Sequence, residues 1–194
     1  AYLALSSIRK RDNLGNKNIL MLSSLKVYKG ILEFIQLANR LNSYKFILVI
    51  NDEESNINNF ISLNKIECPP NLKLYSRQDD IVPFYRKASL LLNLSNKDLF
   101  IETFGMTVLE AFTAGIPVIV PTVGGIAELV DDNIDGYKID VKNLDLIEKK
   151  ICEILSTEEL YNSLKENAIS KSEKFDLDNM IMEIIAIFEK NKAK

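Results

Sequence analysis

The sequence predicts an α/β fold: a single Rossmann-like, doubly wound parallel sheet. Short apolar runs rich in β-forming residues recur along the chain, and helical patterns lie between most of them. These runs are apolar almost throughout, which is typical of parallel strands covered by helices on both faces. Right-handed crossovers would connect such strands. The chain has 194 residues, enough for one full core, so one such domain is expected.

The expected strands are the apolar runs at residues 19–22, 46–50, 72–75, 90–94 and 118–120, with a further short strand at 137–140. Between the first two runs, the apolar residues follow the three-and-four spacing of a helix with one buried face. They are Ile31, Phe34, Ile35 and Ala38. We expect that face to cover the sheet.

The last third of the chain is expected to be mostly helical, with helices at residues 144–155, 158–174 and 177–189. The final helix carries an apolar stripe that needs a covering surface, formed by Ile181, Ile184, Ile185 and Phe188. We interpret that stripe as core or interface. Residues 1–17 are interpreted as a polar lead-in or interdomain segment, and residues 18–174 as the domain itself.

Composition excludes several classes of protein. Apolar residues make up 47% of the chain and charged residues 26%, the balance of a soluble globular protein. No apolar stretch approaches the roughly 20 residues of a membrane helix. The N-terminus lacks the basic start and apolar region of a secretory signal, so a cytoplasmic protein is expected. The formal charge of −3 argues against a nucleic-acid partner.

The sequence contains no histidine. This excludes Ser/His and Cys/His catalytic arrangements, and histidine metal sites, within the chain. Cys68 and Cys152 lie far apart in unrelated contexts, so we interpret both as reduced thiols. Any chemistry here must therefore use other groups.

The segment from Glu102 to Glu110 carries the strongest chemical signal. Gly105 can open a tight loop into a helix, so the amides of residues 105–108 would point outward and unpaired, forming an anion site. On a helix, the two glutamates would lie about 12 Å apart. This arrangement suits a ligand with a diphosphate between two hydroxyl-bearing ends. Glu102 would accept hydrogen bonds from a hexose, and Glu110 from a ribose diol.

These residues resemble the Glu-x7-Glu signature of the retaining glycosyltransferases of the group 1 or family 4 type, which have the two-domain GT-B fold. Phe104 and Gly105 lie inside the signature, and Glu110 closes it. Further similar blocks are Lys29-Gly30, residues 74–76, 81–88, 114–119, 124–130 and 133–136. The resemblance covers nearly the whole chain from Asn18 onward. It implies that the predicted sheet is the C-terminal half of a GT-B fold.

The resemblance implies a donor-binding domain, from which a glycosyltransferase transfers a sugar from a nucleoside-diphosphate-sugar to an acceptor with retention of configuration. Lys29 and Glu102 would be catalytic, since Lys29 would neutralise the leaving diphosphate and Glu102 would hold the sugar. The nucleotide-sugar would also contact Gly30, Arg77, Phe104, Gly105, Met106, Thr107 and Glu110. Neither a metal nor a cofactor is expected to be required.

An acceptor domain normally precedes this region in such enzymes. The acceptor, whether sugar, lipid or protein, would bind through that missing N-terminal domain, and residues 175–194 would pack on it. The isolated domain is therefore expected to bind the donor and scarcely to transfer it. Peripheral membrane association of the full enzyme is compatible with this scheme.

Two departures and two alternatives stay open. Ser24 stands where the family commonly has an arginine, so either the diphosphate is neutralised more weakly or Lys26 or Arg77 assists. Ser76 stands where a glycine is common after the base-pocket strand, which leaves the identity of the base open. The alternatives are a noncatalytic nucleotide-sugar binding module and a GT-B nucleotide-sugar epimerase.

Simpler roles are also open for individual residues. Taken alone, Glu110 would be typical of a solvated helix position and Lys29 of a surface lysine beside a turn, but the surrounding motif favours the ligand-binding role for both. For Phe104 we favour a packed loop anchor over a stacking platform. Gly124 and Gly125 are expected to make the turn into the next helix first and to approach a ligand second.

Overall fold

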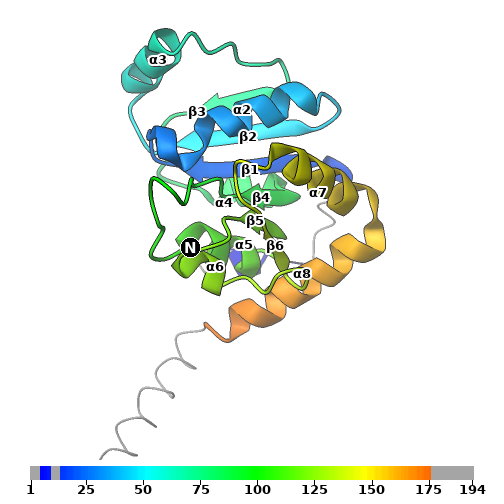
Figure 1. Cartoon of the computed structure of the whole chain (residues 1–194). Coiled ribbons are helices and arrows are strands. Elements are labelled where there is room, and N and C mark those ends of the chain that lie inside the picture. Colours follow the sequence, from blue (N-terminus) through cyan, green and yellow to red (C-terminus); the bar gives the residue numbers. More distant parts are fainter. Residues whose placement is uncertain (1–4, 10–13, 176–194) are drawn as a thin grey trace, which may run out of the picture.

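The computed structural model of the protein describes residues 5–9 and 14–175. Six strands form one sheet in the order β3-β2-β1-β4-β5-β6, and every neighbouring pair is parallel (Figure 1). The strands are β1 (Asn18–Ser23), β2 (Lys45–Ile50), β3 (Leu72–Tyr75), β4 (Leu90–Leu92), β5 (Val118–Val120) and β6 (Gly136–Lys138). The predicted Rossmann-like parallel sheet is confirmed.

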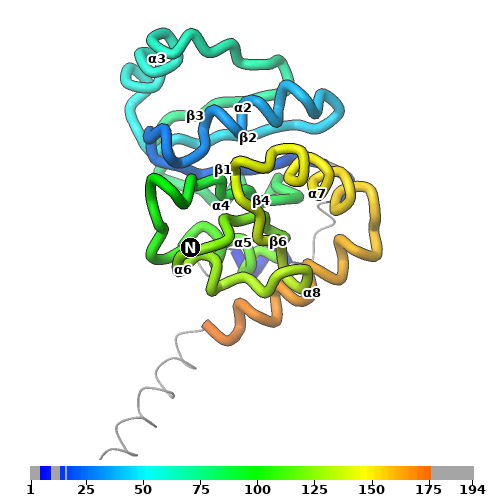
Figure 2. The backbone as a smooth tube through the Cα atoms, in the orientation of Figure 1, coloured from blue at the N-terminus to red at the C-terminus, as the bar shows by residue number. Residues whose placement is uncertain are grey.

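Helices follow the strands along the chain (Figure 2). They are α2 (Ile31–Arg40), α3 (Glu54–Leu63), α4 (Val82–Lys87), α5 (Met106–Thr113), α6 (Gly125–Glu128), α7 (Leu144–Ser156) and α8 (Glu158–Glu173), with short 3-10 turns η1 (Leu14–Asn16) and η2 (Val27–Lys29). No helix in the described part of the chain is both long enough and apolar enough to cross a bilayer.

The sheet separates two apolar cores. Ile19 and Met21 of β1 point into one core, together with α2, α3 and α7, whereas Leu20 points into the other, together with α4, α5 and α6. Successive side chains of a strand face opposite sides of a sheet, so a doubly covered strand must be apolar on both. Helix α8 contacts both α7, which belongs to the core on one face of the sheet, and α5, which belongs to the core on the other face. This double burial explains the near-continuous apolar runs in the sequence.

Helix α2 buries the face that its sequence predicts, including Phe34 and Ala38. Gly30 precedes it with φ +79°, a left-handed conformation that favours glycine. A Cβ added at Gly30 would overlap the carbonyl oxygen of Leu94, in the loop after β4. The start of α2 is therefore fixed against the segment that follows β4.

Strand β4 ends earlier than expected, at Leu92 rather than at residue 94. The side-chain oxygen of Asn93 accepts a hydrogen bond from the amide of Ser95 at 3.1 Å, which turns the chain out of the sheet. The last strand likewise covers residues 136–138 and not 137–140. A hydrogen bond from a backbone amide to a nearby side chain, such as that of Ser95 to Asn93, cannot be predicted from the apolar pattern of the sequence.

The start of the chain packs more closely than a polar lead-in would. Leu5 and Ile8 are each 1% exposed and belong to the core beneath α5. The guanidinium of Arg9 donates to the carbonyl oxygen of Thr113 at 2.8 Å and to the hydroxyl of Ser172 at 3.0 Å, joining the ends of α5 and α8. Residues 5–9 are thus part of the domain's packing. The helix expected at 177–189 lies outside the described residues.

Candidate functional site

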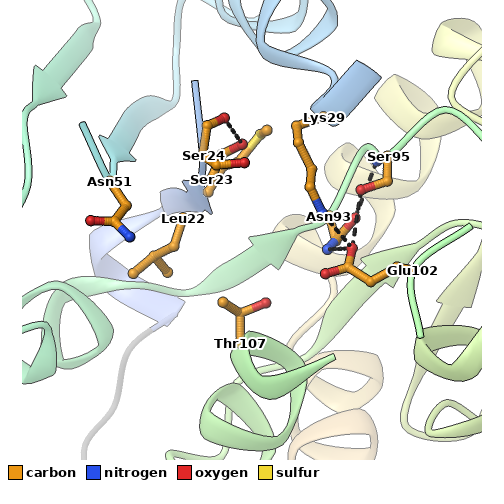
Figure 3. Close-up of a pocket in the computed structure, with 10 residues that line it drawn as sticks. Leu22, Ser23, Ser24, Lys29, Asn51, Asn93, Ser95, Glu102 and Thr107 are labelled. Atoms are coloured by element: carbon orange, nitrogen blue, oxygen red, sulfur yellow. Dashed lines mark hydrogen bonds and ion pairs between the residues drawn. The ribbon is translucent and has the colours of Figure 1, made fainter. Parts of the chain in front are cut away.

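An open pocket of about 250 Å³ lies at the carboxyl ends of β1 and β4. The strand order reverses between these two strands, and at such a point an open parallel sheet binds its ligands. The pocket is lined by Met21, Leu22, Ser23, Ser24, Lys29, Asn51, Asn93, Ser95, Glu102 and Thr107 (Figure 3). The two residues expected to be catalytic therefore share one pocket.

Glu102 is held by three donors at a single oxygen. Its Oε2 accepts hydrogen bonds from Asn93 Nδ2 at 2.9 Å and Ser95 Oγ at 3.1 Å, and it lies 3.3 Å from the ammonium of Lys29 (Figure 3). Both members of the ion pair are mostly buried, with 16% of the Lys29 side chain and 19% of the Glu102 side chain exposed. The geometry fixes the carboxylate and leaves Oε1 for a ligand.

Asn93 and Ser95 are site residues that the sequence interpretation missed. A signal existed, because both are polar residues directly after a buried strand, where the sheet presents ligand-binding groups. An apolar pattern that runs through residue 94 hides Asn93, because the strand ends at Leu92.

An aromatic pair supports Lys29. Its ammonium lies 4.5 Å from the centre of the Phe100 ring, and that ring stacks on Tyr28 at a centroid distance of 4.9 Å. A cation over an aromatic face is attracted by the ring quadrupole. Sequence patterns identify neither Tyr28 nor Phe100 as part of the site, because the contacts of the Phe100 ring join the loop after β1 to the loop after β4.

The start of α5 contains amides without a hydrogen-bond partner in the described chain, but fewer than expected. The amides of Val108 and Leu109 both donate to the carbonyl oxygen of Gly105, at 2.9 and 3.1 Å. Within the described chain, the N–H groups of residues 105, 106 and 107 make no hydrogen bond. Of the range of roughly 105–108 that was expected to be free, Val108 is already used by the helix.

Gly105 is buried at the start of α5, and the reason is packing. A Cβ there would lie 2.6 Å from the Cγ1 atom of Ile126. Because the helix begins only at Met106, Glu102 lies in the preceding loop, and the helical separation of about 12 Å between the glutamates does not apply.

Glu110 does not line the pocket. Its Oε2 accepts a hydrogen bond from the hydroxyl of Tyr85 at 2.7 Å, and that hydroxyl lies 3.2 Å from the carbonyl oxygen of Thr107, which does line the pocket. Burial raises the pKa of the Glu110 carboxyl, although the hydrogen bond from Tyr85 acts in the opposite direction. Glu110 is therefore partly buried beside the pocket, not a freely solvated helix residue.

Three further residues expected to contact the nucleotide-sugar lie outside the pocket lining: Arg77, Phe104 and Met106. Arg77 lies outside the pocket lining, but its Nε donates to the side-chain oxygen of Asn51, which is part of the lining, at 3.0 Å. Phe104 and Met106 also lie outside it and are 48% and 56% exposed. About half of Phe104 is therefore left uncovered by this domain, and its interpretation as a packed loop anchor stays a prediction.

Around Lys29, Gly30 sets the backbone as described above, and Ser24 lines the pocket beside it. Ser76, where the family commonly has a glycine, lies outside this pocket. The amide of Lys26 donates to the carbonyl oxygen of Ser24 at 2.8 Å.

Gly124 and Gly125 make the turn into α6. Gly124 has φ +96°, and the amide of Gly125 donates to the carbonyl oxygen of Glu102 at 2.8 Å. A Cβ on Gly125 would overlap the carbonyl oxygen of Thr103. The glycine pair therefore lets the loop that carries Glu102 lie directly against α6.

The fold and this pocket define a class: an open parallel α/β domain with a pocket at its topological switch point. Residues 6–171 match the family model described as glycosyl transferases group 1. The chain belongs to this family.

Individual proteins agree with this assignment. An uncharacterized glycosyltransferase of Methanocaldococcus jannaschii is 32% identical over 135 residues, which cover 69% of this chain and 36% of that protein. The chain therefore spans about a third of that relative's length.

Two solved structures share the fold. The Anabaena protein Alr3699/HepE, in complex with UDP-glucose, has a TM-score of 0.75 at 20% identity, covering 98% of this chain and 53% of that one. The C-terminal domain of the group 1 glycosyl transferase LpcC from Francisella tularensis has a TM-score of 0.68 at 16% identity, covering 89% of this chain and 98% of that domain. The protein thus has the fold of a group 1 C-terminal domain.

Proposed function

We propose that this chain is the donor-binding domain of a retaining glycosyltransferase, which transfers a sugar from a nucleoside-diphosphate-sugar to an acceptor. The observation that carries the proposal is the contact between Lys29 and Glu102 at 3.3 Å, in a pocket at the carboxyl ends of β1 and β4. A cation and a carboxylate in one small pocket suit a ligand that carries both phosphate and hydroxyl groups.

Each group has a role in this scheme. The ammonium of Lys29 and the free amides of residues 105–107 receive the diphosphate and stabilise the charge that develops as it leaves. Glu102 accepts hydroxyl hydrogen bonds of the sugar through Oε1, while Asn93 and Ser95 hold Oε2. Glu110 receives the ribose diol at the pocket's border. Leaving-group stabilisation dominates the chemistry.

The nature of the donor is supported by similarity. HepE was solved with UDP-glucose, and its fold matches almost the whole of this chain. A uridine nucleotide is therefore the first donor to test. We infer that the reaction needs no metal, since the ammonium of Lys29 and the amides at the start of α5 would neutralise the diphosphate.

The complete enzyme is proposed to contain an N-terminal domain that binds the acceptor, since the chain spans about half of the HepE chain. Retention is tested by joining the domain to its upstream region and determining the anomeric configuration of the product by NMR. An inverted product would contradict the mechanism. Donor binding without turnover by the joined protein would favour a noncatalytic binding module instead.

Donor binding is measured by calorimetry on the chain with UDP-glucose, with and without a chelator. We expect binding in both cases, and a requirement for added metal would contradict the phosphate site. Glu110→Ala is expected to weaken binding by about 1.5–3 kcal/mol, because a charged hydrogen-bond partner of the ribose is lost. Unchanged affinity in this variant would remove Glu110 from the site.

A further inference from the structure

Tyr85 connects α4 to α5 beside the candidate site. The residue lies in α4, is completely buried, and directs its hydroxyl toward α5. That hydroxyl lies 2.7 Å from Oε2 of Glu110 and 3.2 Å from the carbonyl oxygen of Thr107. A tyrosine has a single O–H proton, and the shorter distance assigns it to the carboxylate. Tyr85 thus donates a short hydrogen bond to Glu110.

The position of Glu110 on α5 makes this bond relevant to the pocket. Thr107 and Glu110 are three positions apart, so they share one face of the helix, and Thr107 lines the pocket. Helical side chains lean toward the N-terminus, which directs the Glu110 carboxylate toward the pocket's border. Tyr85 occupies Oε2, and Oε1 makes no hydrogen bond within the described chain.

The bond also acts against the cost of burying a charge. Glu110 is partly buried, and that burial raises the pKa of its carboxyl, whereas the donor on Tyr85 lowers it. Burial raises the pKa of the Tyr85 hydroxyl well above its usual value, so the hydroxyl remains a neutral donor at physiological pH. One side chain therefore both orients Glu110 and favours its ionised form.

We propose that Tyr85 is a positioning residue: it fixes Oε2 of Glu110 so that Oε1 accepts hydrogen bonds from the vicinal diol of the donor's ribose. This inference rests on the proposed function, since it assumes a ribonucleotide in the pocket. It adds that the site selects for the ribose hydroxyls, and that this selection depends on a residue that does not touch the ligand.

The test compares two nucleotides on two proteins. Calorimetry measures the affinity of the wild type and of Tyr85→Phe for UDP and for 2′,3′-dideoxy-UDP, with ADP and GDP pairs used if UDP does not bind. The variant is expected to lose roughly threefold to tenfold affinity for UDP, the effect of one hydrogen bond, and less than twofold for the dideoxy nucleotide. Equal losses for both nucleotides, or no loss for either, would overturn the proposal.

Tyr75→Phe is the matched control. Its ring packs on Phe84 of the same helix at a centroid distance of 5.0 Å, and its hydroxyl makes no hydrogen bond within the described residues. Its affinities for both nucleotides should equal those of the wild type. A loss specific to UDP in this control would show that any hydroxyl near α4 has the effect, and would contradict the proposal.

A pH series gives a readout that a merely structural role would not change. Binding of UDP should weaken as Glu110 becomes protonated at low pH, and in Tyr85→Phe this weakening should begin at a higher pH, because the bond that lowers the pKa is lost. Coincident pH profiles would overturn the proposal.

Should Tyr85→Phe fail to fold, Glu110→Ala tests the contact with the diol on which the inference depends, because this variant removes both carboxylate oxygens and must abolish the preference for UDP over the dideoxy nucleotide. A preference that persists in Glu110→Ala would overturn the inference. Failure of every nucleotide to bind the wild type would instead overturn the proposed function, and the inference with it.

Discussion

Glu102 and Glu110 lie in two regions with opposite surroundings. In the loop after β4, Oε2 of Glu102 accepts hydrogen bonds from Asn93 and Ser95 and forms an ion pair with Lys29. On α5, Glu110 lies against the apolar core and meets one donor, Tyr85. The loop stabilises its carboxylate with several polar partners, whereas burial disfavours the charge on α5. The two residues are of the same type and lie in one short segment, but their different surroundings give their carboxylates different properties.

Because their surroundings differ, the two glutamates should respond differently to substitution. The carboxylate of Glu102 depends on charge and on how closely the two loops that carry its donors pack together. The carboxylate of Glu110 depends on burial and on one hydroxyl, that of Tyr85. Four experiments examine the contrast.

The largest effect is expected from the backbone that holds the first region. Gly30→Ala places a Cβ against the carbonyl oxygen of Leu94 at a φ of +79°. We expect a loss of about 2–4 kcal/mol of unfolding free energy from the strained conformation and the steric overlap. Urea denaturation measures it. Gly15→Ala is the matched control, since nothing lies within 4 Å of its Cβ, and it should be nearly neutral.

A smaller effect concerns charge in the first region. Lys29→Met keeps the length of the side chain and removes the ammonium, so binding of UDP-glucose should weaken by about 1.5–3 kcal/mol. Calorimetry measures the change. Lys73→Met, at an exposed lysine of β3 outside the pocket, should bind as the wild type does. Similar losses in both variants would indicate general electrostatics rather than a specific contact.

The second region should respond to pH. Burial raises the pKa of native Glu110, so the native state holds this proton to a higher pH than the unfolded chain does. Stability therefore falls as pH rises from the ordinary glutamate pKa through the raised one. Glu110→Gln should melt at a higher temperature than the wild type at pH 7, and the difference should disappear at low pH. A Tm difference independent of pH would contradict this.

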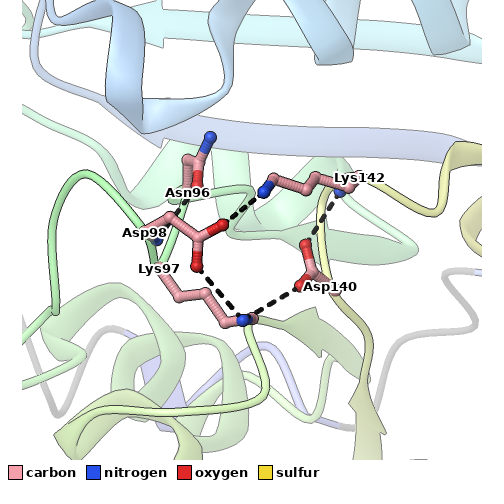
Figure 4. A network of polar contacts seen from close by, with 5 residues as sticks. All are labelled: Asn96, Lys97, Asp98, Asp140 and Lys142. Carbon is pink, nitrogen blue, oxygen red and sulfur yellow. Dashed lines mark hydrogen bonds and ion pairs between the residues drawn. The ribbon is translucent and has the colours of Figure 1, made fainter.

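The smallest effect is expected from exposed charges on the loop before Glu102. Lys97 and Lys142 both pair with Asp98, and Lys97 also pairs with Asp140 at 3.4 Å (Figure 4). The pairing, chiefly with Lys142, lowers the pKa of Asp98, so its stabilising contribution is present above the unfolded pKa and lost as pH falls through the lowered one.

Lys142→Met should accordingly lower the Tm slightly at pH 7 and low salt. The difference should vanish in high salt, which screens exposed pairs. Melting curves at two salt concentrations measure it. A large loss that is insensitive to salt would mean that the network supports the loop by packing instead of charge.

The sequence predicted the fold well because apolar periodicity reports burial, and burial on both faces is what a covered parallel strand requires. It also predicted that Lys29 and Glu102 meet, since each follows a strand at the sheet's carboxyl edge. It could not predict the aromatic support of Lys29 by Phe100, or the bond from Tyr85 to Glu110. Such contacts depend on how loops and helices from distant parts of the chain pack, which local patterns do not encode.

The approach of Gly125 to the loop of Glu102 has a consequence for engineering. The amide of Gly125 donates a hydrogen bond to the carbonyl oxygen of Glu102. The shape of the Glu102 loop therefore depends on a residue that follows β5 in the chain. Transplanting residues 102–110 alone into another scaffold would leave that partner behind. The smallest portable unit is the loop together with the glycine pair, and a library that diversifies one must keep the other constant.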